Sequence, residues 1–224
     1  MISITWIIIG ITVAVSFIGF SKQEVVDKLI FYPPAVADNR EYYRFISCGF
    51  IHADLPHLIF NMYALYLFGE GMQKEGVEFL FGDIFGNNGK MLYLVMYVLA
   101  LAVCLIPTFN KHKANYYYRS LGASGAVSAV VFAYILLDPM RGVGLIFIPV
   151  FIPGFLFGII YLVVSYFLGK KGKGHINHSA HIWGALFGIV FLIICSKLFT
   201  TYPVLENFIN AVKNTDYHRI FTTN

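Results

Sequence analysis

The sequence predicts an all-α membrane protein built from six transmembrane helices. Of its 224 residues, 58% are hydrophobic and 12% are charged, whereas soluble domains average about 45–50% apolar and about 25% charged residues. This composition excludes an ordinary soluble enzyme, a disordered chain and a coiled coil. The net charge of +4 suits a protein beside anionic lipid, and we expect no nucleic-acid partner.

A helix needs about 20 apolar residues to cross the roughly 30 Å hydrocarbon core of a bilayer. The first apolar segment lacks the basic start and short core of a signal peptide, so we expect it to be retained as a helix. The expected organisation is a six-helix membrane domain over 1–199 and a polar C-terminal tail over 200–224. The six expected spans are 2–20, 52–71, 91–108, 122–138, 145–168 and 179–199.

The connecting segments carry the charged and aromatic residues typical of a membrane–water interface. We expect the first, residues 21–51, to be ordered at the membrane surface. The segment Asp138–Gly142 predicts a tight turn before the fifth helix. Pro149 and Pro153 make that fifth helix the least regular of the six. The three widely spaced cysteines indicate neither a disulfide framework nor a zinc motif.

Polar residues gather at the starts of the second, fourth and sixth helices. With six spans, these three starts lie on the same side of the membrane, opposite the termini. Polar groups inside a membrane are costly and usually face a protein interior or a water-filled cavity. We therefore expect the three clusters to meet at a similar depth, where the function is found.

The fourth helix begins with Gly122-Ala123-Ser124-Gly125. The N–H of a residue at a helix start has no intrahelical partner, so the Ser124 N–H can stabilise an oxyanion. The same small residues also form rows that suit close helix packing. On this motif alone, catalysis and packing are both open interpretations.

The sixth helix carries His178 and His181 on one face, followed by Gly184 and Gly188 in a GxxxG row. A helix packed on that row would touch His181. If this neighbour is the fourth helix, Ser124 meets His181 and forms the nucleophile and general base of acyl transfer. The alternative is that each histidine bonds a backbone carbonyl between helices.

The second helix is predicted to begin at Asp54–Pro56, with proline in its first turn. His57 and Asn61 are four residues apart and share a face. Their side-chain N–H groups can bind an oxyanion together with the Ser124 N–H, or they can form a polar clamp between helices. His52 precedes the helix, and we expect it to order the preceding loop.

These motifs resemble the rhomboid family of intramembrane serine proteases. The resemblance covers roughly residues 1–199. Three motifs in this order, at the starts of alternate helices, are far more specific than any one of them. They are Gly122-Ala123-Ser124-Gly125, His181-Ile182-Trp183-Gly184 and the pattern His52…His57…Asn61.

The resemblance implies a six-transmembrane-helix rhomboid-like bundle that hydrolyses peptide bonds in or near substrate transmembrane helices. Its implied partners are transmembrane protein substrates and the lipid bilayer, it needs no metal or cofactor, and it sits as a multi-pass protein in a bacterial inner membrane. Because no carboxylate lies in the fourth- or sixth-helix cluster, we expect a Ser–His dyad. The implied roles are Ser124 as nucleophile, His181 as general base, His57, Asn61 and the Ser124 N–H as oxyanion hole, and His52, His178, Gly122, Gly125, Gly184 and Gly188 as support.

The sequence departs from the family pattern at two places. Tyr43-Arg44 stands where the family commonly has Trp-Arg, and we expect Arg44 to anchor the first loop to lipid or backbone. Some members stack an aromatic residue, one turn after the serine, on the base. Ser128 occupies that place here, so His181 lacks this support or obtains it elsewhere; Trp183 points the wrong way along the helix.

Three alternatives stay open. A non-catalytic relative could bind membrane clients, although such proteins typically lack the serine or the histidine. All the polar groups could instead be clamps between helices. A metal-dependent membrane enzyme could use an imidazole site, although HExxH is absent and carboxylates are scarce. The histidines available to it are His52, His57, His175, His178 and His181.

Membrane orientation and oligomeric state also stay open. Family topology, with cytoplasmic termini, puts ten Lys and Arg residues in the outer loops and six on the inner side. The positive-inside rule favours the reverse orientation.

Overall fold

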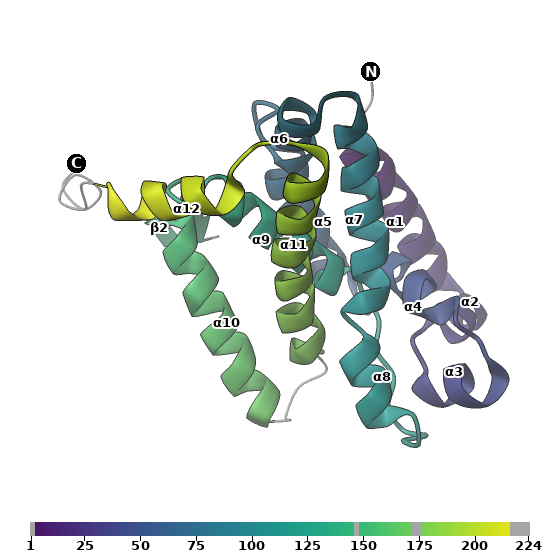
Figure 1. Cartoon of the computed structure of the whole chain (residues 1–224). Helices are drawn as coiled ribbons and strands as arrows, with labels where there is room; N and C mark the ends of the chain where they lie inside the picture. Colours follow the sequence, from purple (N-terminus) through teal and green to yellow (C-terminus); the bar gives the residue numbers. More distant parts are fainter. Residues whose placement is uncertain (1–2, 146–147, 172–175, 216–224) are drawn as a thin grey trace.

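Helices form a bundle around one central helix in the computed structural model, which describes residues 3–145, 148–171 and 176–215 (Figure 1). A helix covers most of each segment that was expected to cross the membrane. A π-helical turn, Tyr66–Glu70, continues the second of these helices. The six are α1 (Ile4–Ser21), α5 (Leu55–Leu65), α7 (Gly89–Val103), α9 (Ser124–Leu137), α10 (Gly154–Lys171) and α11 (His178–Phe199).

Three helical stretches within the described residues are long and apolar enough to cross a membrane. They are Ile4–Ser21, Val77–His112 and His178–Phe199. The helices α9 and α10 are apolar but shorter. The prediction of a mainly helical fold with apolar, membrane-length helices is therefore confirmed.

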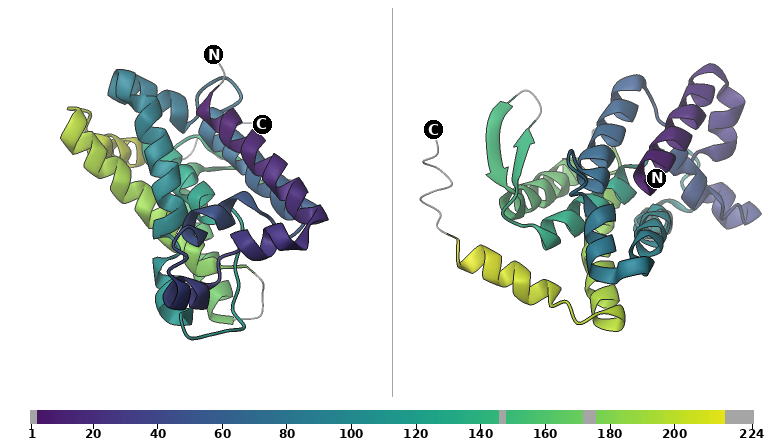
Figure 2. Two further views of the ribbon diagram at one scale, coloured as in Figure 1. Left: turned by 90° about the vertical axis from the view of Figure 1, so that its right-hand side faces the viewer. Right: turned by 90° about the horizontal axis from the view of Figure 1, so that it is seen from above.

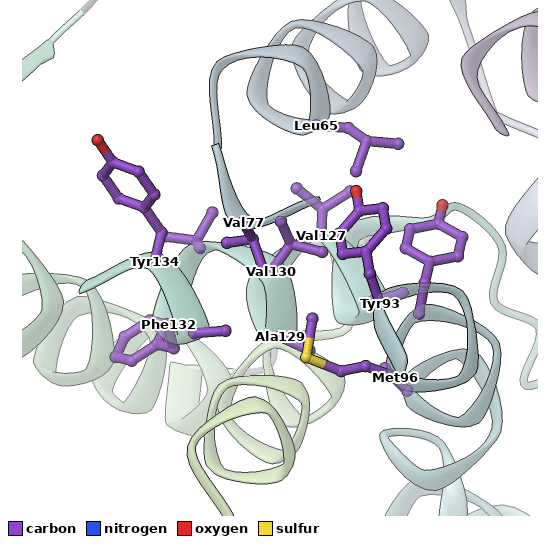
Figure 3. Close-up of a cluster of buried hydrophobic side chains, with 14 of the residues drawn as sticks. Leu65, Val77, Tyr93, Met96, Val127, Ala129, Val130, Phe132 and Tyr134 are labelled. Carbon is purple, nitrogen blue, oxygen red and sulfur yellow. The ribbon is translucent and has the colours of Figure 1, made fainter. Parts of the chain in front are cut away.

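The central helix α9 is packed on all sides, and every residue from Gly125 to Leu136 is buried. On one side lie large apolar side chains of α5 and α7, which Figure 3 shows around Val127 and Val130. On the side of α11 the packing is much closer. A Cβ added to Gly184 would lie 2.0 Å from the Gly125 carbonyl oxygen, and one added to Gly188 would lie 2.2 Å from that of Ala129. Glycine at both positions lets the two backbones touch.

The expected fifth span, 145–168, is wrong at its start. An antiparallel hairpin of β1 (Gly142–Leu145) and β2 (Ile148–Pro153) precedes α10, and Val143 pairs with Ile152 in it. Two prolines, Pro149 and Pro153, explain the difference. Proline removes a backbone donor and disfavours the helical conformation in the residue before it, so an apolar run with two prolines adopts an extended form. The expected turn at Asp138–Gly142 thus leads into a strand.

The first connection is ordered, as expected, and consists of short helices. These are α2 (Gln23–Leu29), α3 (Pro33–Asn39) and α4 (Arg44–Ser47), followed by a 3-10 turn at Cys48–Phe50. In Figure 1 they lie beside the lower half of the bundle.

Two further helices, which sequence analysis did not separate, flank α7. α6 (Val77–Phe85) occupies the middle of the expected second loop, and α8 (Ile106–His112) follows α7. Pro107 in the first turn of α8 accounts for the break between α7 and α8, because proline is accepted at a helix start but not within a helix.

The C-terminal segment, which was expected only to be a polar tail, contains a helix. α12 (Val204–Lys213) follows α11 and buries Val204, while Leu205 and Ile209 are exposed. Figure 2 shows α12 and the hairpin on one side of the bundle and α1–α4 on the other. Residues 216–224 of the expected tail lie outside the described residues.

Candidate active site

Ser124 and His181 form a hydrogen bond between α9 and α11. The distance from His181 Nε2 to Ser124 Oγ is 2.8 Å. Ser124 is the first residue of α9, and His181 lies in the first turn of α11. The close contact of Gly184 with Gly125, one turn along α11, brings these two helix starts together. A serine hydroxyl bonded to an imidazole is the geometry of a nucleophile with its general base.

Asn177 fixes the first turn of α11, which carries His181. Its side-chain oxygen accepts the Ala180 N–H at 3.1 Å, and the amide is also paired with the Thr108 hydroxyl of α8 at 3.1–3.2 Å. Sequence analysis missed this residue as the N-cap and placed the start of the span at residue 179, one residue after the observed start of α11. The available signal was an asparagine directly before an apolar helix, since asparagine is among the best N-caps.

A cavity of about 870 Å³ adjoins the Ser124–His181 pair. Its polar end holds these two residues with His57 and Asn61, so the structure places all four predicted residues at one site. The rest of the wall comes from α5 and its continuation, α9 and α10, together with the end of α7 and the segment 117–122 before α9. The part from α5, α9 and α10 is largely apolar. That wall includes Phe60, Ala64, Phe68, Val127, Val131 and Phe157.

His57 lies against the backbone just before α9. A Cβ added to Gly122 would lie 2.8 Å from His57 Cε1, and Gly122 has a φ of +107°. Both the space and the conformation therefore require glycine there. The Asn61 amide donates one hydrogen bond to the His57 carbonyl at 3.0 Å. Since a side-chain amide carries two N–H bonds, the second is available for a substrate oxygen.

His52 links α1 to the residue before Ser124. Its Nδ1 is 3.0 Å from the Ser16 hydroxyl, and the Ala123 N–H donates to its Nε2 at 3.4 Å. The ring also packs edge-on against His57, with centroids 4.9 Å apart. The expected role of ordering the preceding loop stays a prediction, because these contacts are with α1, with His57 and with the residue before Ser124.

His181 obtains its aromatic neighbour from α10. The ring of Tyr161 lies nearly parallel to the imidazole, at an angle of 25° and with centroids 6.1 Å apart. Ser128, which holds the family's aromatic position, is 2.7 Å from the Tyr161 hydroxyl. Trp183 is 46% exposed and takes no such place. Sequence analysis missed Tyr161, because nothing in the pattern of α10 marks which residue faces His181.

His178 packs edge-on against His181, with centroids 5.6 Å apart. The hydrogen bond to Ser124 is made by His181. In the part of the chain that the structure describes, no Asp or Glu pairs with His181, and no three His, Cys, Asp or Glu residues are grouped to hold a metal ion. His175, one of the histidines of the metal alternative, lies outside the described residues.

Arg44 anchors the first loop through hydrogen bonds to backbone carbonyls. Backbone was one of the two anchors that the sequence led us to expect, the other being lipid. Arg44 Nη1 donates to the carbonyls of Asp27 and Ile30, both at 2.8 Å, and Arg44 Nε donates to Glu41 at 2.5 Å. The hydrogen bond from Arg44 lowers the pKa of the Glu41 carboxyl. The loop is thereby closed on itself next to the site.

The helices and the site define a polytopic membrane protein with a polar centre at its helix starts. The Rhomboid domain family model matches residues 39–198, which is more than half of the chain. The chain therefore belongs to the rhomboid family, and it is an integral membrane protein.

A relative in Arabidopsis thaliana, RHOMBOID-like protein 12, mitochondrial, is 32% identical over 145 residues. The match covers 62% of this chain and 42% of that protein, so the chain spans less than half of the relative's length. The relative's name places it in mitochondria. The expectation of a bacterial inner membrane therefore finds no support in this comparison.

Proposed function

We propose that this protein is an intramembrane serine endopeptidase that uses a Ser124–His181 dyad. The observation that carries the proposal is the 2.8 Å hydrogen bond between His181 Nε2 and Ser124 Oγ at the polar end of a cavity. A half-buried hydroxyl bonded to an imidazole, with His57 and Asn61 nearby, is the arrangement that acyl transfer needs.

The dyad would hydrolyse a peptide bond in two steps. Ser124 Oγ attacks the carbonyl carbon while His181 Nε2 takes the hydroxyl proton, and the oxyanion is bound by the Ser124 N–H with N–H groups of His57 and Asn61. His181 then gives its proton to the leaving amine as the C–N bond breaks. Water attacks the acyl-serine with His181 again as base, which releases the acid and restores the Ser124 hydroxyl.

The length of α9 supports a site below the membrane surface. The helix has 14 residues and is about 21 Å long at 1.5 Å per residue, which is shorter than the roughly 30 Å hydrocarbon core. A helix of this length that crosses the membrane has at least one end within the bilayer, and the proposal places the Ser124 end there. Water needed for hydrolysis would reach it through the cavity.

The walls of the cavity favour a transmembrane segment as substrate. α5 contributes Phe60 and Ala64 to one wall, and α10 contributes Phe157 and Tyr161 to another. A substrate helix entering between α5 and α10 would meet apolar side chains first and the dyad at the polar end. The bond to be cut must unwind locally, because a helical peptide bond is shielded from attack.

Fluorophosphonate labelling tests the dyad, since these probes trap an activated serine. The full chain in mild detergent is compared with Ser124→Ala and His181→Ala, with and without a chelator. Matched controls are Ser179→Ala, an exposed serine on α11, and His112→Ala on α8. We expect labelling to be lost in the first pair, kept in the controls and indifferent to chelator.

A second assay separates the alternatives. The protein is placed in liposomes with a reporter transmembrane substrate. If a folded wild type neither labels nor cleaves, the client-binding alternative replaces the protease proposal. Loss of activity with chelator would instead favour the metal-dependent alternative.

A further inference from the structure

The base of the dyad is held from one side by a residue of another helix. Tyr161, on α10, stacks against His181, which is on α11, and its hydroxyl is 2.7 Å from Ser128 of α9. The Ser128 hydroxyl also donates to the Ser124 carbonyl at 2.8 Å. Since a serine hydroxyl has one proton, the Tyr161 O–H must be the donor to Ser128 Oγ. A continuous chain of contacts therefore runs from the start of α9 through Tyr161 to the imidazole.

The surroundings of Tyr161 keep its ring in this orientation. Phe132 of α9 lies 5.6 Å from it and Phe157, one turn earlier on α10, lies 6.0 Å from it, centroid to centroid. Gly158 lets α10 approach α9, because a Cβ there would lie 3.3 Å from both Ile135 and Phe132. The ring is thus fixed by a hydrogen bond at one end and by aromatic contacts along its faces and edges.

We propose that Tyr161 is a positioning residue for His181, and that Ser128 is the hydrogen-bonding anchor that replaces an aromatic residue at its own position. This inference rests on the proposed protease function and deepens it. A consequence is that the imidazole keeps its orientation only while α10 is packed on α9. A displacement as small as about 1 Å can cost a reaction on the order of a hundredfold, so a loosened imidazole would slow attack by Ser124.

The test measures the two constants of fluorophosphonate inactivation separately, on the full chain in detergent. Tyr161→Leu is expected to lower the inactivation rate constant, kinact, by about tenfold or more, with the binding constant KI within about twofold of wild type. Phe167→Leu is the matched control, because Phe167 is an exposed aromatic residue of the same helix and is not among the residues that line the cavity. It is expected to keep most of kinact. Thermal unfolding confirms that each variant is folded.

A relocated aromatic separates positioning from general packing. The double variant Ser128→Phe/Tyr161→Leu places a ring one turn after Ser124 and is expected to recover kinact by severalfold over Tyr161→Leu. If Tyr161→Leu does not fold, Tyr161→Phe and Ser128→Ala, which keep the ring and remove the hydrogen bond, decide the matter through a reduced kinact.

The outcomes for the two proposals differ. A folded Tyr161→Leu that labels with wild-type kinact, or that changes only KI, overturns the positioning role and leaves the dyad standing. Wild-type protein that fails to label, with no difference from Ser124→Ala, overturns the protease function itself. Equal loss of kinact in Phe167→Leu and Tyr161→Leu would also overturn the positioning role, because it would show a general effect of changing α10.

Discussion

The backbone contact between α9 and α11 makes Gly184→Ala the sharpest test of how the site is built. The added Cβ would lie 2.0 Å from the Gly125 carbonyl oxygen, whereas ordinary contact begins near 3.4 Å. The atom that blocks it is backbone and cannot rotate away. The helices must therefore separate by about 1.4 Å at this level.

The separation acts directly on the dyad, because Gly184 lies three residues after His181. Carried to the helix starts, it would stretch the 2.8 Å bond between Ser124 and His181 to about 4 Å, beyond the roughly 3.2 Å reach of a general base. We expect a loss of fluorophosphonate labelling rate on the order of a hundredfold. Overpacking should also lower the free energy of unfolding by about 1–3 kcal/mol.

The assay compares labelling rates and thermal unfolding in the same detergent. Gly82→Ala in α6 is the control, since nothing lies within 4 Å of a Cβ at that position, and alanine favours a helix. Wild-type labelling and stability in Gly184→Ala would refute the reasoning, because they would show that α9 and α11 are not in backbone contact.

Three other predictions concern the elements around the site. Arg44→Ala removes two hydrogen bonds to backbone carbonyls and should lower the free energy of unfolding by about 1.5–3 kcal/mol. Arg44→Lys lacks the planar guanidinium and should not restore wild-type stability. An unchanged unfolding curve in Arg44→Ala would contradict the role of Arg44 as an anchor of the first loop. Because Arg44 lowers the pKa of Glu41 in the folded protein, the contact between these two side chains stabilises the fold fully above pH 4.5. This stabilisation is lost as the pH falls through the lowered pKa of Glu41. Glu41→Gln should flatten that part of a melting-temperature profile, and an equally steep profile would speak against it. Asn177→Ala removes the cap of α11 and its pairing with Thr108. The loss should lower the free energy of unfolding by about 1 kcal/mol and slow fluorophosphonate labelling, because His181 lies in the turn that is capped. Labelling at the wild-type rate would show that the cap does not position His181.

Much of the site could be predicted because its signals are local. Polar residues at the starts of three apolar helices are costly unless they meet, and the GxxxG row of α11 indicates where a neighbour can approach. Ser124, His181, His57 and Asn61 all line the same cavity. The anchoring of Arg44 to backbone was also within reach of the sequence.

Errors arose where local chemistry competes with hydropathy. The segment before α10 is apolar enough to read as part of a span, yet Pro149 and Pro153 turn it into a strand. Asn177 was overlooked although its position before α11 is a familiar cap. In both cases the sequence contains the residue responsible. The conformational preference around the prolines and the capping side chain of Asn177 decided the local structure more strongly than the apolar pattern did.

The sequence by itself determined the class of protein, the family and the set of residues on which the proposed acyl transfer would depend. These follow from composition and from motifs read along one helix at a time. Sequence analysis already named His181, and not His178, as the partner of Ser124. Only the tertiary structure decided that Tyr161 supplies the ring that Ser128 does not. Contacts of this kind join different helices: Ser124 and His181 are 57 positions apart in the sequence, and Ser128 and Tyr161 are 33 positions apart. They depend on the rotation and depth of each helix in the bundle, which are set by packing across the whole molecule and leave no signal in any single segment.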